Sequence, residues 1–192
     1  MLRMCAMGDD RRTATGDELA TMKRLLAQCL DEGAYGFSTG LVFIPGCWAD
    51  TEEVIALAKL AGERDLLYAS HIRGERETNI AATQEFIAIA ERAQVRGQMS
   101  HMHSKYPVLG NAVQKIEMLE AARRRGVDVT ADSDAYPGTS AGLGGFLQIY
   151  NYTQAELMER LRSPAGRAEF KQTMRTIDPW HPLGRFGPGG VP

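Results

Sequence analysis

The sequence lacks long apolar runs and an excess of charge, and each absence excludes a class of protein. No apolar stretch approaches the roughly 20 residues that a membrane-spanning helix needs. The formal net charge is −2, so the charge balance does not point to nucleic acid or to a membrane surface. The first residues form no apolar core before a small-residue cleavage site, which argues against a signal peptide.

A cysteine framework is also missing. The three cysteines, Cys5, Cys29 and Cys47, are odd in number and form no Cys-x-x-Cys pair. This argues against a disulfide scaffold and fits a reducing compartment. Hydrophobic residues make up 44% of the chain and charged residues 24%, as in ordinary globular proteins. We therefore expect a cytoplasmic protein that binds neither nucleic acid nor membranes.

Helix-like and strand-like segments alternate as far as Asp132. The spacing of apolar residues predicts helices over 17–32, 50–61, 78–94 and 111–125, and short apolar runs predict strands over 34–39, 67–71, 98–101 and 127–132. Such β-α repeats with short connections imply a parallel sheet with right-handed crossovers. A doubly wound sheet and a barrel both satisfy this α/β pattern. A complete barrel has eight strands and typically ~250 residues, so a barrel here would be about half of one.

The pattern changes after Asp132. Glycine, serine and proline over 133–145 predict a long loop, and helices are predicted over 153–162 and 164–174. We therefore divide the chain into a partial (β/α) barrel over 1–150, a helical extension over 151–177 and a loop or disordered tail over 178–192.

Two histidines stand at the ends of successive predicted strands. His71 closes one strand and His101 the next, one β-α unit later. Parallel α/β folds place their chemistry at the carboxyl ends of strands, so the two imidazoles should lie on neighbouring strands at the same face. Two neutral imidazoles there can bind a borderline metal such as Zn²⁺. The alternative is a pair of polar strand-end residues whose side chains are satisfied by the backbone.

Ordered motifs surround these histidines, and together they carry a resemblance to a known family. They occupy 7–11, 32–41, 45–46, 49–53, 68–73, 98–101, 128–132 and 136–137. At matching spacing they resemble the N-acyl-D-amino-acid deacylases (D-aminoacylases) of the amidohydrolase superfamily, over about residues 1–150. The resemblance implies a metal-dependent (β/α)8 barrel, in which the predicted strands are strands four to seven.

The resemblance also implies a reaction and a set of site residues. His71 and His101 match the family's metal-ligand histidines, with Zn²⁺ as the cofactor and a small N-acyl-D-amino acid as substrate. Water activated by the metal would hydrolyse the amide bond, assisted by an aspartate general base. The family's lysine for the substrate carboxylate is replaced by His103, which moves that role to Lys105 or leaves it in doubt. Tyr136 resembles the family's substrate-contacting tyrosine, or has a structural role in its turn.

Three further residues have two interpretations each. Ser38 stands at a predicted strand end, where it contacts substrate or closes the loop backbone. Arg73 pairs with a carboxylate near the metal face or is a solvated loop charge. Asp132 either orients a metal-ligand histidine without contacting the metal itself, or caps the loop that follows.

Parts of the family pattern have no counterpart in this sequence. The family's His-x-His of the first strand is absent, since the sole His-x-His here is 101–103. Its bridging cysteine and its general-base aspartate would fall outside these residues. A catalytic zinc usually has three protein ligands. We therefore expect a fragment with no catalytic residue of its own, inactive alone.

Two other functions stay open. One is a dihydroorotase-like cyclic amidase, because most substrate contacts would lie outside the chain. The other is a non-catalytic β/α domain that binds a metal or a partner. A partial barrel exposes the edges of its sheet, and such edges pair with other chains, so we expect self-association.

Overall fold

The structure is a computed structural model, and it describes residues 1–75, 77–102, 110–133 and 152–176. Contacts within the chain divide it into two units, Met1–Ala135 and Tyr136–Pro192. Each unit is described by itself. The division of the chain at residues 150 and 177 stays a prediction.

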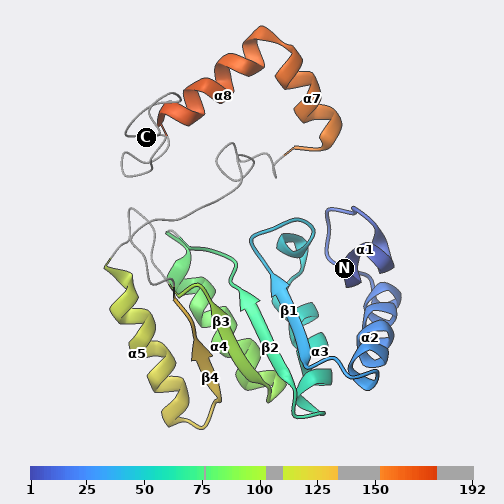
Figure 1. The fold of residues 1–192 in the computed structure, drawn as a ribbon, viewed down its shortest axis with the longest axis vertical. Coiled ribbons are helices and arrows are strands. Elements are labelled where there is room, and N and C mark those ends of the chain that lie inside the picture. Colours follow the sequence, from blue (N-terminus) through green and yellow to red (C-terminus); the bar gives the residue numbers. More distant parts are fainter. Residues whose placement is uncertain (76, 103–109, 134–151, 177–192) are drawn as a thin grey trace. The chain divides into compact units, whose positions relative to one another are not determined.

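The first unit is built on a parallel sheet of four strands (Figure 1). The strands are β1 (Gly36–Gly40), β2 (Leu67–His71), β3 (Arg96–Ser100) and β4 (Val129–Ala131). They lie in the order β1-β2-β3-β4, so each pairs with its neighbour in sequence. A doubly wound sheet reverses its strand order at a switch point. The sequential order therefore selects an arc of a barrel, and the α/β prediction is confirmed.

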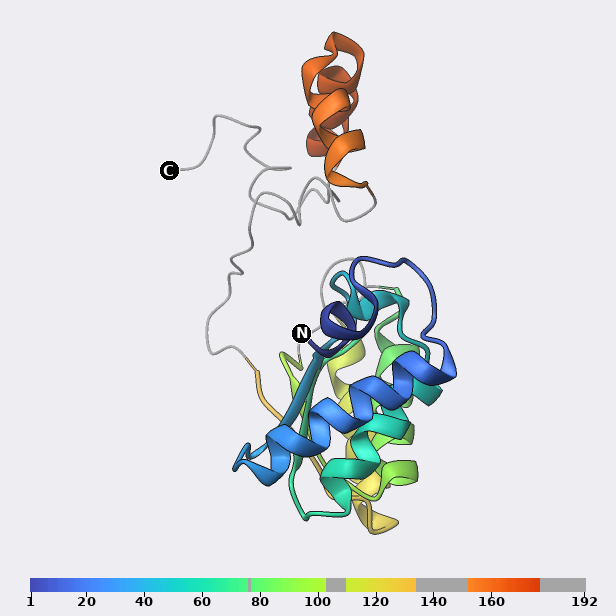
Figure 2. The ribbon, with the colours of Figure 1, turned by 90° about the vertical axis from the view of Figure 1, so that its right-hand side faces the viewer.

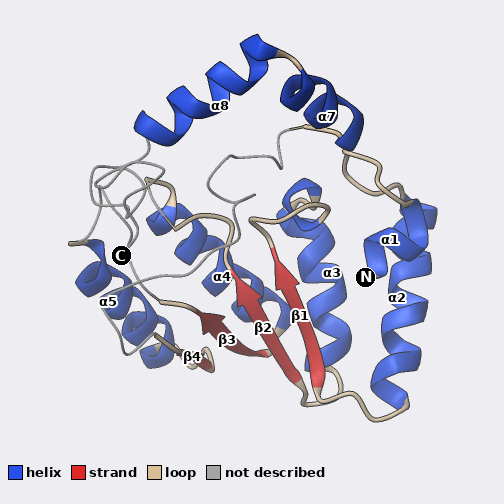
Figure 3. Ribbon diagram, turned by 45° about the horizontal axis from the view of Figure 1, so that its top comes forward, coloured by secondary structure: helices blue, strands red, loops and turns tan. Residues whose placement is uncertain are grey.

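Helices follow or precede each strand and cover one face of the sheet. They are α2 (Gly16–Asp31), α3 (Thr51–Gly62), α4 (Asn79–Ala93) and α5 (Asn111–Arg124). Figure 2 shows α2, α3 and α4 on the same side of the strands, and Figure 3 shows α3 and α4 behind β1 and β2. One-sided helix cover is the arrangement of a barrel wall, in which the helices form the outer layer.

The core lies between the sheet and these helices. Side chains alternate across a strand, and Tyr68, Met99 and Val129 are the ones that point to the helices and are buried. The Tyr68 ring stacks on Phe86 of α4 with ring centroids 6.1 Å apart. At Gly97 a Cβ would lie 2.9 Å from the Phe86 ring, so only glycine lets that ring approach the sheet.

The opposite face of the sheet, which we call the open face, is not covered by the described residues. It carries Ser38 and Thr130, which are exposed, and Leu67, which is 39% exposed. His71 points to this face because it stands four residues after Leu67 in the same strand. In a closed barrel this face is the interior.

Side-chain caps stabilise the first turns of α2 and α3. Thr15 and Glu18 form a capping box at α2, and the Asp50 carboxylate accepts the Glu53 N–H at 2.8 Å at the start of α3. Hydrogen bonds from Arg12 and from Thr15 hold the pKa of Glu18 at about 2. Both helices begin within one residue of the start predicted from the sequence.

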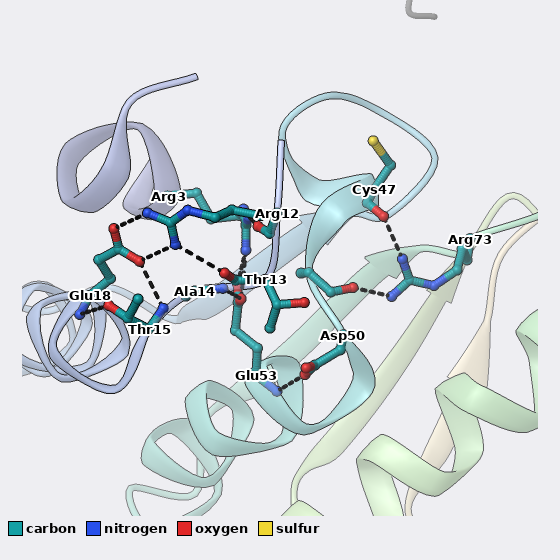
Figure 4. A network of polar contacts seen from close by, with 11 residues as sticks. Arg3, Arg12, Thr13, Ala14, Thr15, Glu18, Cys47, Asp50, Glu53 and Arg73 are labelled. Carbon is teal, nitrogen blue, oxygen red and sulfur yellow. Dashed lines mark hydrogen bonds and ion pairs between the residues drawn. The ribbon is translucent and has the colours of Figure 1, made fainter. Parts of the chain in front are cut away.

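A short helix, α1 (Leu2–Met7), was not predicted from the sequence. Its Arg3 reaches Glu53 of α3, with Nη1 at 2.6 Å and 2.5 Å from the two carboxylate oxygens. Both side chains are buried, and the Glu53 carboxylate also accepts the Ala14 N–H at 3.3 Å (Figure 4). This buried ion pair ties the first residues of the chain to the helix layer.

The second unit contains α7 (Gln154–Arg162) and α8 (Pro164–Thr176), both of which were predicted. Tyr152 joins them, because its ring meets Phe170 edge-on at 6.0 Å and the Arg160 guanidinium lies 4.6 Å above it. No helix among the described residues of either unit is long and apolar enough to cross a membrane.

Replacing Glu53 by alanine should destabilise the first unit by about 3 kcal/mol, because it leaves the Arg3 charge buried without its partner. The matched control is Glu52→Ala, which removes the neighbouring but exposed ion pair with Arg92 and should change stability little. Urea unfolding followed by circular dichroism measures both. Equal midpoints for the two variants would contradict a stabilising role for the buried pair.

Candidate metal centre at the carboxyl ends of β2 and β3

The register of β2 and β3 brings His71 and His101 together. His71 pairs with Ser100, the residue directly before His101, so the two histidines are neighbours at one edge of the sheet. Their ring centroids are 5.3 Å apart and the rings meet edge to face. Strand β3 ends at Ser100 rather than at His101, so His101 lies just beyond the strand. Two imidazoles at this spacing can share one metal ion.

The His71 ring is largely enclosed. Its side chain is 20% exposed, the Phe43 ring contacts it edge-on at 4.9 Å, and Glu75 Oε1 lies 3.2 Å from its Nε2. Nε2 is nevertheless buried without a hydrogen bond in the part of the chain that the structure describes. A buried polar atom of this kind signals a missing partner, because such atoms are nearly always satisfied.

Asp132, beyond the end of β4, fixes the backbone of His101. Its Oδ1 accepts the His101 N–H at 2.8 Å, and its Oδ2 accepts the side-chain amide of Gln98 at 2.9 Å. The hydrogen bond from His101 is the main cause that lowers the pKa of Asp132. His101 has a φ of 60°, a left-handed conformation that is uncommon outside glycine. The carboxylate therefore stabilises a backbone turn that aims the His101 ring off the strand.

The other residues that the sequence singled out lie in different places. Ser38 is exposed on the open face, in β1. His103, Lys105 and Tyr136 lie outside the described residues. For these residues a role in substrate binding stays a prediction.

Arg73 joins two loops at the same end of the sheet. Its guanidinium donates to both Glu85 carboxylate oxygens. It also donates to the carbonyl oxygens of Cys47 and Ala49, at 3.0 Å and 2.8 Å (Figure 4). The interaction with Glu85 raises the pKa of Arg73. Its Nε, Nη1 and Nη2 are therefore engaged in holding the loop after β1 against α4.

Glu75 is the residue near this centre that sequence reasoning missed. It follows His71 by four residues, in the turn between β2 and α4. The sequence feature that could have identified Glu75 is a carboxylate four residues after a strand-end histidine. Among the described residues, no group of three or more His, Cys, Asp or Glu side chains converges as a metal site. The centre therefore offers two imidazole ligands, which is one fewer than a catalytic zinc usually has.

No family model matches the chain, but similar proteins are known. The chain is 38% identical over 140 residues to N-acyl-D-glutamate deacylase of Alcaligenes xylosoxydans xylosoxydans, covering 72% of the chain and 29% of that protein. It is 35% identical over 137 residues to D-aminoacylase of the same organism, covering 71% of the chain and 28% of that protein.

Solved structures agree in fold. A crystal structure of N-acyl-D-glutamate deacylase from Bordetella bronchiseptica, complexed with zinc and a phosphonate inhibitor, matches with a TM-score of 0.70 and 37% identity over 72% of this chain and 29% of that one. A crystal structure of D-aminoacylase, which defines a novel subset of amidohydrolases, matches with a TM-score of 0.67 and 33% identity over 70% and 28%. The chain thus spans less than a third of the length of these relatives.

Replacing Asp132 by alanine should release the turn at His101 and raise the hydrogen-exchange rate of the His101 amide by about tenfold, the effect of losing one hydrogen bond to a charged group. The control is Asp128→Ala, an exposed carboxylate at the start of the same strand segment. Exchange followed by NMR measures both. An unchanged His101 rate in Asp132→Ala would show that the carboxylate does not fix this turn.

Proposed function

We propose that this chain, which belongs to the N-acyl-D-amino-acid deacylase family, supplies two metal-ligand histidines to an enzyme that hydrolyses N-acyl-D-amino acids. The observation that carries the proposal is the pair of imidazoles, His71 and His101, 5.3 Å apart at the carboxyl ends of adjacent strands. That edge is where barrel enzymes place their chemistry. The similarity to N-acyl-D-glutamate deacylase, at 38% identity, supports the substrate class.

The residues present suit zinc. Imidazole nitrogens are among its preferred ligands, and the His71 and His101 rings lie close enough, with centroids 5.3 Å apart, to share one ion. When bound, zinc supplies Lewis acidity toward the amide carbonyl and toward water. The chain's own part is to hold the two rings in place: β2 fixes His71, and Asp132 fixes the backbone of His101. The remaining ligand and the general base must come from residues outside the described part of the chain.

We also propose residues for substrate recognition. Lys105 or His103 would pair with the substrate carboxylate, because each follows His101 closely in the chain and carries a cation or a donor. Ser38 would contact substrate from the open face of β1. Tyr136 and Arg73 remain further candidates, with Arg73 already engaged in holding two loops.

The exposed strand edges and the cysteines support proposals about association and compartment. Within the described residues β1 and β4 each pair with one neighbouring strand, so each leaves one backbone edge unpaired. Such edges associate with other chains, and we expect self-association of this chain. Its three free thiols, at Cys5, Cys29 and Cys47, fit the reducing cytoplasm.

The chain should bind one zinc ion, and His71→Ala and His101→Ala should each weaken zinc binding. The loss should exceed the roughly 10–100-fold that is typical when a residue hydrogen-bonded to a metal ligand is replaced. His181→Ala, which lies outside the motifs of the family, is the control and should bind as the parent chain does. Competition with a chromogenic chelator measures the affinities. Binding that survives the loss of either histidine would refute the proposed ligand pair.

Hydrolysis assays on N-acyl-D-amino acids test whether this chain binds zinc but lacks the residues needed for catalysis. We expect the chain alone to bind zinc without hydrolysing these substrates, because its described residues provide two ligands. Hydrolysis by the chain alone would show that the general base and a third ligand lie within these 192 residues.

A further inference from the structure

The environment of the His71 ring contains one acidic group that the proposed function does not use. Glu75 Oε1 lies 3.2 Å from His71 Nε2, which is within hydrogen-bond distance, although the ring is not aligned for a hydrogen bond in this structure. Nε2 is buried, so water does not compete for it. Among the described residues, Glu75 is the acidic group within hydrogen-bond distance of this nitrogen.

The position of Glu75 is built by the fold. Its side chain is 14% exposed, although it stands in a turn, where carboxylates are usually solvated. The turn is tight, because a Cβ at Gly74 would collide with the Thr78 hydroxyl. Arg73, on the other side of Gly74, anchors the same turn to α4 through Glu85. The Glu75 carboxylate is therefore held beside the His71 ring by contacts on both sides of it.

A buried cation interacts electrostatically with this carboxylate. Lys115 of α5 is fully buried, and the start of α5 is held beside the start of α4 by the hydrogen bond of Asn111 to Asn79, at 3.0 Å. Burial lowers the pKa of Lys115, and the charge of Glu75 raises it in the opposite direction. Buried lysines are almost always paired. A carboxylate can accept a hydrogen bond but cannot donate one.

We infer that Glu75 is a positioning residue for His71: its carboxylate, 3.2 Å from Nε2, favours a proton on Nε2 and leaves Nδ1 as the nitrogen that faces a metal. Carboxylates that accept the second N–H of a ligand histidine fix its tautomer and its orientation. A neutral imidazole carries one proton, so a proton held at Nε2 leaves the lone pair at Nδ1. The inference deepens the proposed function and rests on it for the metal, but the tautomer of His71 can be measured without any metal.

Nitrogen-15 NMR of the zinc-free chain at pH 8 tests the tautomer, and chelator competition tests the affinity for zinc. We expect the Nε2–H tautomer for His71 in the parent chain. Glu75→Ala should mix the two tautomers and weaken zinc binding by about 10–100-fold. Glu75→Gln keeps an acceptor oxygen and should preserve most of the tautomer preference. Glu77→Gln, an exposed glutamate in the same segment, is the matched control and should leave both properties unchanged.

The two levels of the account fail in different ways. An Nδ1–H tautomer in the parent chain, or the same tautomer and zinc affinity in Glu75→Ala as in the parent, would overturn the role of Glu75. Absence of zinc binding in the parent chain would overturn the proposed function, while a tautomer that responds to Glu75→Ala would still support the positioning of the ring. Far-ultraviolet circular dichroism, together with the conservative Glu75→Gln variant, separates these results from a loss of folding.

Discussion

The in-register parallel pairing of β2 with β3 is the constraint on which the proposed centre depends. The carboxyl ends of parallel strands lie at the same end of a sheet. This register pairs His71 with Ser100, and His101, the next residue, therefore lies beside His71. A slip by one residue would move His71 to the helix face, because side chains alternate along a strand. The packing of Tyr68 and Met99 against the helices resists that slip, since it would expose both. The core of the unit thus secures the geometry of its open face.

The two histidines are held by different means, although they occupy equivalent places. His71 belongs to its strand, and its ring is enclosed by Phe43 and by Glu75. His101 lies beyond its strand in a left-handed conformation, and its backbone is held by the Asp132 carboxylate of the next strand segment. Residues beyond the ends of the neighbouring strands, Phe43 after β1 and Asp132 after β4, thus contact the two histidines.

Local patterns in the sequence predicted most elements, because caps, helical spacing and strand runs are local signals. Strand β2 has both of its predicted bounds, and helix α7 ends at Arg162 as predicted. Short α1 was missed, since the contact that holds it, Arg3 with Glu53, joins residues far apart in sequence. The end of β3 was misplaced by one residue because the left-handed turn at His101 depends on Asp132. The β-α pattern alone left a barrel and a doubly wound sheet open, the family resemblance implied the barrel, and the strand order agrees with it. For the site, strand ends predicted the histidine pair, whereas the position of Glu75 beside the His71 ring depends on the turn after β2, which no local pattern specified.

The central claim is that His71 and His101 bind one metal ion. Anomalous diffraction from crystals of the zinc-loaded chain, recorded on both sides of the zinc absorption edge, tests it most directly. The account predicts one zinc peak between the two rings, at about 2.0–2.1 Å from a nitrogen of each. A peak that touches neither ring, or a zinc ion held by cysteine sulfur elsewhere in the chain, would contradict it.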